Sequence, residues 1–177
     1  MKAMVMVAHP DDCVIFAYGF MNHYKNFDWT VCYLTYTEQY PRGKEFANFW
    51  KTRGVKTQFL GFSDNYRDLE TGIISFDTVA ADQSIKQAVA DQDLILTHDC
   101  EGDYGHLHHK FVYHSVAKHH EYVVCFAGNH QGTVKYLIEP GTYRLDEFPL
   151  HRDVVAGFHT DKHENEYTVT EKVMRIL

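Results

Sequence analysis

A short apolar segment followed by His-Pro-Asp-Asp constrains this chain more than any other feature of its sequence. Residues 4–8 form an apolar run that is typical of a buried strand, and the tetrapeptide at 9–12 follows it directly. An imidazole and two carboxylates therefore stand at the carboxyl end of a strand, where open α/β sheets place their ligand sites. From a tight turn, His9 and Asp12 can reach one cation, which leaves Asp11 beside it as a candidate base.

The rest of the chain alternates strand-like and helix-like segments. Strands are expected at 2–8, 29–37, 56–62, 94–97 and 122–127. Helices are expected between them, at 11–25, 43–51, 77–90 and 105–120, and a loop at 63–76. This alternation predicts a Rossmann-like, three-layer α/β/α fold with a mainly parallel, doubly wound sheet.

The part of the chain after Gly128 has a weaker pattern. Residues 134–138 are compatible with an edge strand, and residues 153–163 with a last helix. No linker or internal repeat interrupts the chain, and 177 residues suffice for one domain with a substantial core. We therefore expect a single domain over residues 1–177.

The charge of the chain limits its partners. The net charge is −7 with histidine counted as neutral, which argues against a nucleic acid or an anionic membrane as the main partner. Neither a secretory signal nor an apolar stretch long enough to span a membrane is visible, so a cytoplasmic location is expected. A homo-oligomer is compatible with this composition.

The four cysteines show no CxxC spacing. Cys32 and Cys125 lie in apolar, strand-like runs and are expected to be buried free thiols. Cys13 and Cys100 lie next to the two polar clusters along the chain. We interpret them as small packing residues rather than metal ligands.

Histidine is concentrated in one part of the chain, because seven of the thirteen histidines lie between His98 and His120. The cluster Tyr-Gly-His-Leu-His-His at 104–109 follows the predicted strand 94–97. It is therefore expected at the same sheet edge as the tetrapeptide at 9–12. Two histidines and one carboxylate around an open position are a common catalytic zinc arrangement, and the combined clusters predict a metal-dependent hydrolase.

Helical spacing separates the histidines of the second cluster. His106 and His109 lie three positions apart and would share one face with Tyr113 and Val116, whereas His108 would point elsewhere. A simpler interpretation also exists for each cluster. The histidines can form a polar helix surface, and the aspartates can merely cap the helix that follows them.

Several segments resemble the PIG-L/LmbE family of zinc-dependent N-deacetylases. Residues 8–12 and 105–109 resemble the paired AHPDD and GHPDH-type motifs of that family. Residues 42–45 match its Arg-x-x-Glu, and residues 60–64 look like its strand-end segment that finishes in Asp. Residues 96–106 resemble the family branch that reads Thr-His-Asn and then Gly-Glu-Tyr-Gly-His. The similarity covers residues 3 to about 125.

The resemblance implies a metal centre and a base. His9, Asp12 and His109 would be the zinc ligands, and Asp11 would be the general base. Mixed imidazole and carboxylate ligands suit zinc, and Fe²⁺ is compatible with the same ligand types. Zinc lowers the pKa of bound water to roughly 7, which turns water into a usable nucleophile at neutral pH.

The resemblance also implies roles around the metal centre. His106 would assist the oxyanion or protonate the leaving amine, and Tyr104 would line the pocket and polarise the carbonyl. Arg42 and Asp64 would be substrate-binding or framework residues. For Arg42, a surface salt bridge to Glu45 is an equally good interpretation.

This chain departs from the family pattern at two places. Cys13 stands where most members have a glutamate after AHPDD, and Leu107 and His108 replace the usual Pro-Asp between the two histidines. The flanking histidines keep their spacing, so the metal centre is still expected.

By this resemblance, the chain would remove the acetyl group from an N-acetylated sugar, such as an N-acetylglucosamine conjugate. Two other interpretations stay open. The first is an amidase that acts on another N-acyl or thiol conjugate. The second is a non-catalytic protein of the same fold that binds a sugar or a metal, a His-rich metal store included.

Overall fold

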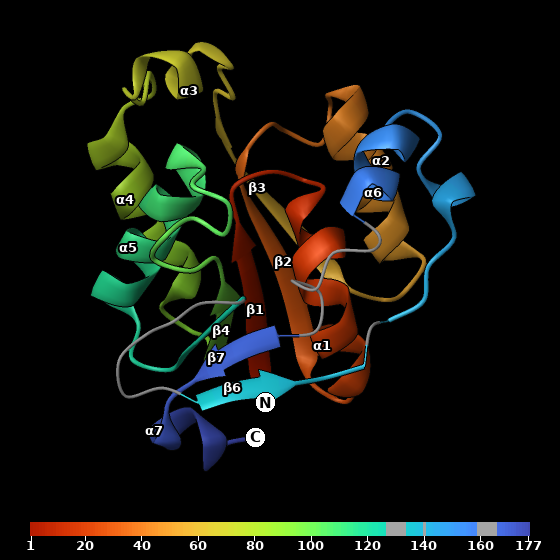
Figure 1. The fold of residues 1–177 in the computed structure, drawn as a ribbon, viewed down its shortest axis with the longest axis vertical. Helices are drawn as coiled ribbons and strands as arrows, with labels where there is room; N and C mark the ends of the chain where they lie inside the picture. Colours follow the sequence, from red (N-terminus) through yellow and green to blue (C-terminus); the bar gives the residue numbers. More distant parts are fainter. Residues whose placement is uncertain (127–133, 140, 159–165) are drawn as a thin grey trace.

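Within the residues that the structure describes, seven strands form one sheet at the centre of the molecule, in the order β3-β2-β1-β4-β5-β7-β6 (Figure 1). The computed structural model describes residues 1–126, 134–139, 141–158 and 166–177. The strands are β1 (Lys2–Val7), β2 (Asp28–Thr35), β3 (Lys56–Phe62), β4 (Leu94–Thr97), β5 (Val123–Cys125), β6 (Val134–Leu137) and β7 (Glu166–Val169). Strands β1 to β5 pair in parallel, whereas β7 and β6 are antiparallel additions at one edge.

Helices cover both faces of the sheet. In Figure 1, α4 and α5 lie on one side of it, and α1, α2 and α6 lie on the other. The helices are the π-helix η1 (Cys13–Ala17), α1 (Tyr18–His23), α2 (Pro41–Lys51), α3 (Arg67–Thr71), α4 (Thr78–Val89), α5 (Leu107–His119), the 3₁₀-helix η2 (Leu145–Glu147), α6 (Arg152–Phe158) and α7 (Glu171–Met174). The predicted three-layer α/β/α fold is confirmed.

The central strand β1 is buried on both faces, as expected in a parallel sheet with helices on each side. Its side chains alternate between two core clusters. Ala3, Val5 and Val7 pack in the cluster that contains Phe46 and Trp50 of α2. The alternate residues pack in the cluster that contains α4 and α5; they are Met4, Met6 and Ala8. No helix in the described part of the chain is long and apolar enough to cross a membrane.

The strand order reverses between β1 and β4. From β1 the chain builds β2 and β3 on one side, and it then returns to add β4 and β5 on the other side. The loops that follow β1 and β4 therefore leave the same sheet edge in opposite directions. Such a reversal opens a crevice at the carboxyl ends of the strands, which is the usual ligand site of this architecture.

Most predicted elements are present with small shifts of their ends, but two predictions were wrong. The segment 11–25 is not one helix, because the π-helix η1 precedes α1. The segment 63–76 contains α3, which ends at Gly72 in a left-handed conformation (φ 69°) and is too short to show periodicity in the sequence. The predicted helix 153–163 is present as α6 up to Phe158, and its remainder lies outside the described residues.

Candidate active site

The two polar clusters meet in one pocket at the carboxyl edge of the sheet. This pocket has a volume of about 450 Å³ and receives side chains from the loops after four strands. Its lining consists of His9, Asp11, Asp12, Tyr36, Arg42, Asp64, Tyr66, Leu69, Tyr104, His106 and Val154. A larger cavity of about 670 Å³ lies between α2 and residues 147–150, but it contains none of the predicted site residues.

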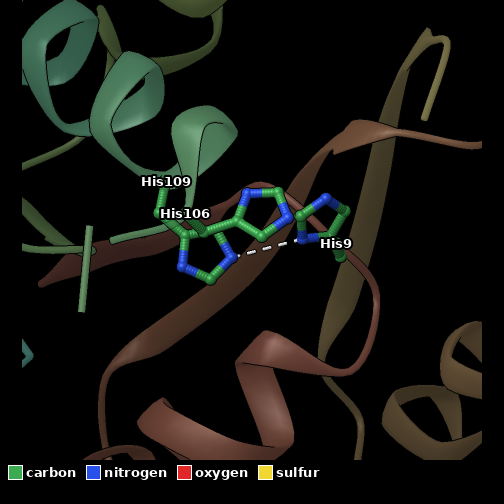
Figure 2. Close-up of side chains that lie close together, drawn as sticks. All are labelled: His9, His106 and His109. Atoms are coloured by element: carbon green, nitrogen blue, oxygen red, sulfur yellow. Dashed lines mark hydrogen bonds between the residues drawn. The ribbon is translucent and has the colours of Figure 1, made fainter. Parts of the chain in front are cut away.

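Three buried side chains form a nearly equilateral triangle of ligand atoms. Nδ1 of His9 lies 3.2 Å from Nε2 of His109 and 3.2 Å from Oδ2 of Asp12. The third edge, from Nε2 of His109 to Oδ2 of Asp12, is 3.3 Å. Figure 2 shows His9 and His109 facing each other across one of these edges. Ligands bound at zinc distances of about 2.0–2.1 Å are spaced in this way in a tetrahedron, so the residues fit a four-coordinate divalent cation.

A hydrogen bond within the turn after β1 fixes the positions of His9 and Asp12 relative to each other. The backbone N–H of His9 donates to Oδ2 of Asp12 at 2.7 Å, which orients the carboxylate toward the two imidazoles. Burial opposes a charge on His9, but the carboxylate of Asp12 outweighs it and raises the pKa of His9 to about 9. The pKa of Asp12 lies well below its usual range, because His109 and His9 outweigh the effect of burial.

Asp103 orients the ring of His109 from the side opposite the triangle. Nδ1 of His109 lies 2.8 Å from Oδ2 of Asp103, so the ring donates there and presents the lone pair of Nε2 to the triangle. Burial opposes charge on Asp103, but the nearby His98 and His109 lower its pKa to about 2. Asp103 lies in the segment 96–106 that resembles the PIG-L/LmbE family, but the sequence alone predicted no role for it.

His98 is a second residue whose role was missed. It is fully buried, and its Nδ1 lies 2.5 Å from the same oxygen of Asp103. Its Nε2 lies 3.5 Å from Oδ2 of Asp12 but accepts a hydrogen bond from the backbone N–H of Ala8 at 3.0 Å. This nitrogen is therefore engaged in a hydrogen bond, and His98 contacts the same carboxylate of Asp103 that orients His109.

The prediction that His108 points away from the site was wrong. Its side chain is 1% exposed, and its Nδ1 lies 3.2 Å from Nε2 of His9. The reason lies in the start of α5. The helix begins at Leu107, and His106 is its N-cap in an extended conformation, so helical spacing does not apply to His106.

His106 lies at the mouth of the site beside His9 and His109 (Figure 2), with ring centroids 4.6 Å from each. Its Nδ1 accepts a hydrogen bond from the backbone N–H of His108 at 3.2 Å, so the proton of the neutral ring is on Nε2. Burial and repulsion from neighbouring imidazoles, His9 first among them, lower its pKa to about 3. At neutral pH His106 is therefore a neutral hydrogen-bond donor.

Asp11 lies in the pocket, where its carboxylate is paired with a cationic side chain. Its carboxylate forms an ion pair with the guanidinium of Arg42, which also donates to the hydroxyl of Tyr36 at 3.1 Å. That hydroxyl in turn donates to Oδ2 of Asp64 at 2.8 Å. The alternative pair of Arg42 with Glu45 is wrong, because α2 turns Arg42 toward the pocket. Glu45 instead accepts from the backbone N–H of Leu150 and lies beside His151.

Tyr104 is 55% exposed and covers the site from one side. Its ring lies edge-on to His109, with the centroids 5.2 Å apart. Partial desolvation of the side chain, with the negative charges of Asp12 and Asp11, raises the pKa of Tyr104. The phenol is therefore protonated and able to donate at neutral pH.

Cys32 and Cys125 are buried free thiols, as predicted. Cys13 is also buried and free, and Cys100 is partly exposed and also free. The thiol of Cys13 donates to the carbonyl of Pro10, and burial raises its pKa. None of the four belongs to a group that could hold a metal among the described residues.

Comparison with solved structures shows the same fold in enzymes of more than one activity. The A40926 pseudoaglycone deacetylase Dbv21 has a TM-score of 0.58 and 13% identity, with 96% of each chain covered. The zinc-inhibited form of the teicoplanin deacetylase Orf2 has a TM-score of 0.55 and 12% identity, covering 89% of this chain and 84% of that one. The hydratase GalB from Pseudomonas putida KT2440 has a TM-score of 0.51 and 14% identity, covering 92% and 80%. At these identities the similarity shows the fold alone.

The comparison with sequence families is more specific than the structural similarity, because it identifies a family. No curated protein matches the chain. The sequence model of the PIG-L family, described as GlcNAc-PI de-N-acetylase, matches residues 4–120, and this span contains every residue of the triangle and of its supports. Because the match covers more than half of the 177 residues, the chain belongs to the PIG-L family of de-N-acetylases and is a hydrolase.

Proposed function

We propose that this protein is a metal-dependent N-deacetylase that removes the acetyl group from an N-acetylglucosamine-type sugar or glycoconjugate. The observation that carries the proposal is the triangle of ligand atoms from His9, Asp12 and His109, with edges of 3.2–3.3 Å. The family description, GlcNAc-PI de-N-acetylase, supports the substrate class. We propose that the deacetylase domain spans residues 1–177, because β5, β6 and β7 complete the same sheet.

His9, Asp12 and His109 would hold the metal. Two imidazoles and one carboxylate suit zinc best, and Fe²⁺ is the alternative for this ligand set. A bound divalent ion supplies a Lewis acid, which makes water more acidic and polarises a carbonyl oxygen. Asp103 keeps His109 in the tautomer that such a metal requires.

Asp11 would be the general base. A carboxylate in the pocket can accept a proton from water as the water oxygen bonds to the acyl carbon. When the C–N bond breaks, the same proton can pass from Asp11 to the nitrogen, so that acetate and a free amine are the products. The ion pair with Arg42 holds the Asp11 side chain in one orientation through this cycle.

His106 and Tyr104 would stabilise the negative charge that develops on the acyl oxygen. The Nε2–H group of neutral His106 and the phenol of Tyr104 are both donors that line the pocket. The low pKa of His106 favours this role over proton delivery to the amine, because the ring carries no extra proton at neutral pH. Arg42 and Asp64 line the same pocket, and we propose that both contact the substrate.

The test is acetate release from a panel of N-acetylglucosamine derivatives by zinc-loaded protein, with an amine-reactive probe reporting the second product. Both signals should rise together, disappear with a chelator and return with zinc. The panel should also contain other N-acyl compounds and thiol conjugates. Turnover of a thiol conjugate alone would favour the amidase alternative. Binding of a sugar without hydrolysis of any amide would overturn the enzyme and favour a binding protein.

A further inference from the structure

The two ring nitrogens of His9 point toward two different groups of side chains that can bind a cation. Its Nδ1 belongs to the triangle with Asp12 and His109, but its Nε2 lies on the other side of the ring. There it is 3.2 Å from Nδ1 of His108 and 3.4 Å from Oδ1 of Asp64. The remaining edge, from Nδ1 of His108 to Oδ1 of Asp64, is 3.8 Å. The edges of this second triangle span 3.2–3.8 Å, against 3.2–3.3 Å in the first.

Both new ligand atoms are oriented by neighbours. Nε2 of His108 lies 2.9 Å from Oδ2 of the buried Asp68, so the ring donates there and its Nδ1 presents a lone pair. Asp68 thus supports His108 as Asp103 supports His109. Oδ2 of Asp64 accepts from the hydroxyl of Tyr36, which leaves Oδ1 directed toward the two imidazoles.

We propose that Nε2 of His9, Nδ1 of His108 and Oδ1 of Asp64 form a second divalent-cation site that shares His9 with the first. The three atoms form a group of the type that holds metals, with two nitrogens and one oxygen. A cation at this site replaces the proton that Nε2 of His9 otherwise donates to His108 or Asp64. Binding therefore releases one proton to solvent, and His9 bridges the two ions.

The second site is weaker than the first. Its cation must displace a ring proton, it is repelled by an ion on the opposite side of the same imidazole, and Arg42 lies 3.6 Å from Oδ2 of Asp64. We expect its dissociation constant for zinc to be about 10- to 100-fold higher than that of the first site. Access is open, because His9 and Asp64 line the active-site pocket.

Occupancy of this site should block the pocket. A cation bound to Asp64 would lie among the residues that we propose as the substrate site, so zinc above one equivalent should inhibit deacetylation. This consequence rests on the proposed function, whereas the binding of a second ion does not. The binding of a second ion and the inhibition of deacetylation can therefore be tested, and can fail, separately.

The experiment is equilibrium dialysis of the full chain against zinc, followed by elemental analysis. The wild-type protein should bind one zinc tightly and a second more weakly, and His108→Ala should bind only the tight one. His114→Ala is the matched control, because His114 lies exposed on the same helix and should leave both sites intact. Wild-type protein that saturates at one zinc, or His108→Ala that still binds two, would overturn the proposal.

A second variant guards against misfolding of His108→Ala. Asp64→Asn should also lose the weaker zinc while keeping the tight one, and thermal unfolding should show that each variant is folded. His109→Ala should lose the tight ion instead, which identifies a failure of the first site independently of the second. If excess zinc inhibits the wild-type protein but inhibits neither His108→Ala nor Asp64→Asn, the second site is the inhibitory one. Equal inhibition of all three would contradict this assignment.

Discussion

The carboxylate of Asp103 lies 2.8 Å from Nδ1 of His109, and this contact determines which nitrogen of the imidazole faces the pocket. Asp103 can hold this position because its backbone is left-handed (φ 61°) and its N–H donates to Oδ1 of Asp99 at 2.8 Å. A carboxylate in this position also makes the metal-facing nitrogen more basic. The proposed metal centre would therefore depend on a residue that is not itself one of the proposed ligands.

We expect Asp103→Asn to weaken zinc binding about 10- to 100-fold, because the amide holds the His109 tautomer less firmly and lacks the negative charge. Competition with a chromophoric chelator measures the affinity. Asp91→Asn, which changes an exposed aspartate, is the matched control and should bind zinc like the wild-type protein. Equal affinities of the two variants would show that Asp103 is only a structural residue.

Zinc affinity should rise with pH from about 6 to 9. The pKa of His9 is raised to about 9 in the metal-free protein, so below that value a proton competes with zinc for Nδ1. The affinity should fall about tenfold for each pH unit below 9 per proton displaced. The same chelator competition, repeated at pH 6, 7 and 8, measures this slope. An affinity that stays flat over this range would mean that His9 is not a ligand.

Much of the site could be predicted because both clusters follow apolar runs. The strand signal placed His9 and Asp12 at one sheet edge, and the run at 94–97 placed the second cluster at the same edge. The role of His108 could not be predicted, because it depends on where α5 begins. A start two residues later leaves His106 outside the helix as its N-cap, so the spacing of His106 and His109 does not define the buried face, and helix ends are the least certain part of a sequence pattern.

The supporting carboxylates were missed for a different reason. Asp68 belongs to α3, a helix of five residues, and it reaches His108 only through the tertiary fold. A single polar residue in a predicted loop carries no signal of such a contact. The pairing of Arg42 with Asp11 likewise depends on how α2 packs, so local spacing wrongly offered Glu45 as the partner.

Asp11→Asn should keep one zinc per chain and lose most of the turnover, by about 10²- to 10⁴-fold, because the amide has a similar shape but cannot accept the proton from water. Elemental analysis and acetate release measure the two properties on the same sample. Loss of zinc from Asp11→Asn, with retention in Asp12→Asn, would reverse the roles of the two aspartates.

His106→Ala should lower kcat by about 10²- to 10³-fold with a smaller change in KM, because its donor acts on the charge of the transition state. Since its pKa is lowered to about 3, His106 does not change charge between pH 5 and 9, and the variant should keep the shape of the wild-type pH profile in that range. Tyr104→Phe should show the same pattern. A change in KM alone would assign both residues to substrate binding.

The most direct test of the central claim is acetate release from an N-acetylglucosamine derivative, measured as zinc is added to metal-free protein. The rate should reach its maximum at one zinc per chain in the wild-type protein and in His114→Ala, and it should stay near zero in His109→Ala at the same zinc concentration. Full activity of His109→Ala, or no activity of the wild-type protein at one zinc per chain, would contradict a catalytic metal held by His9, Asp12 and His109.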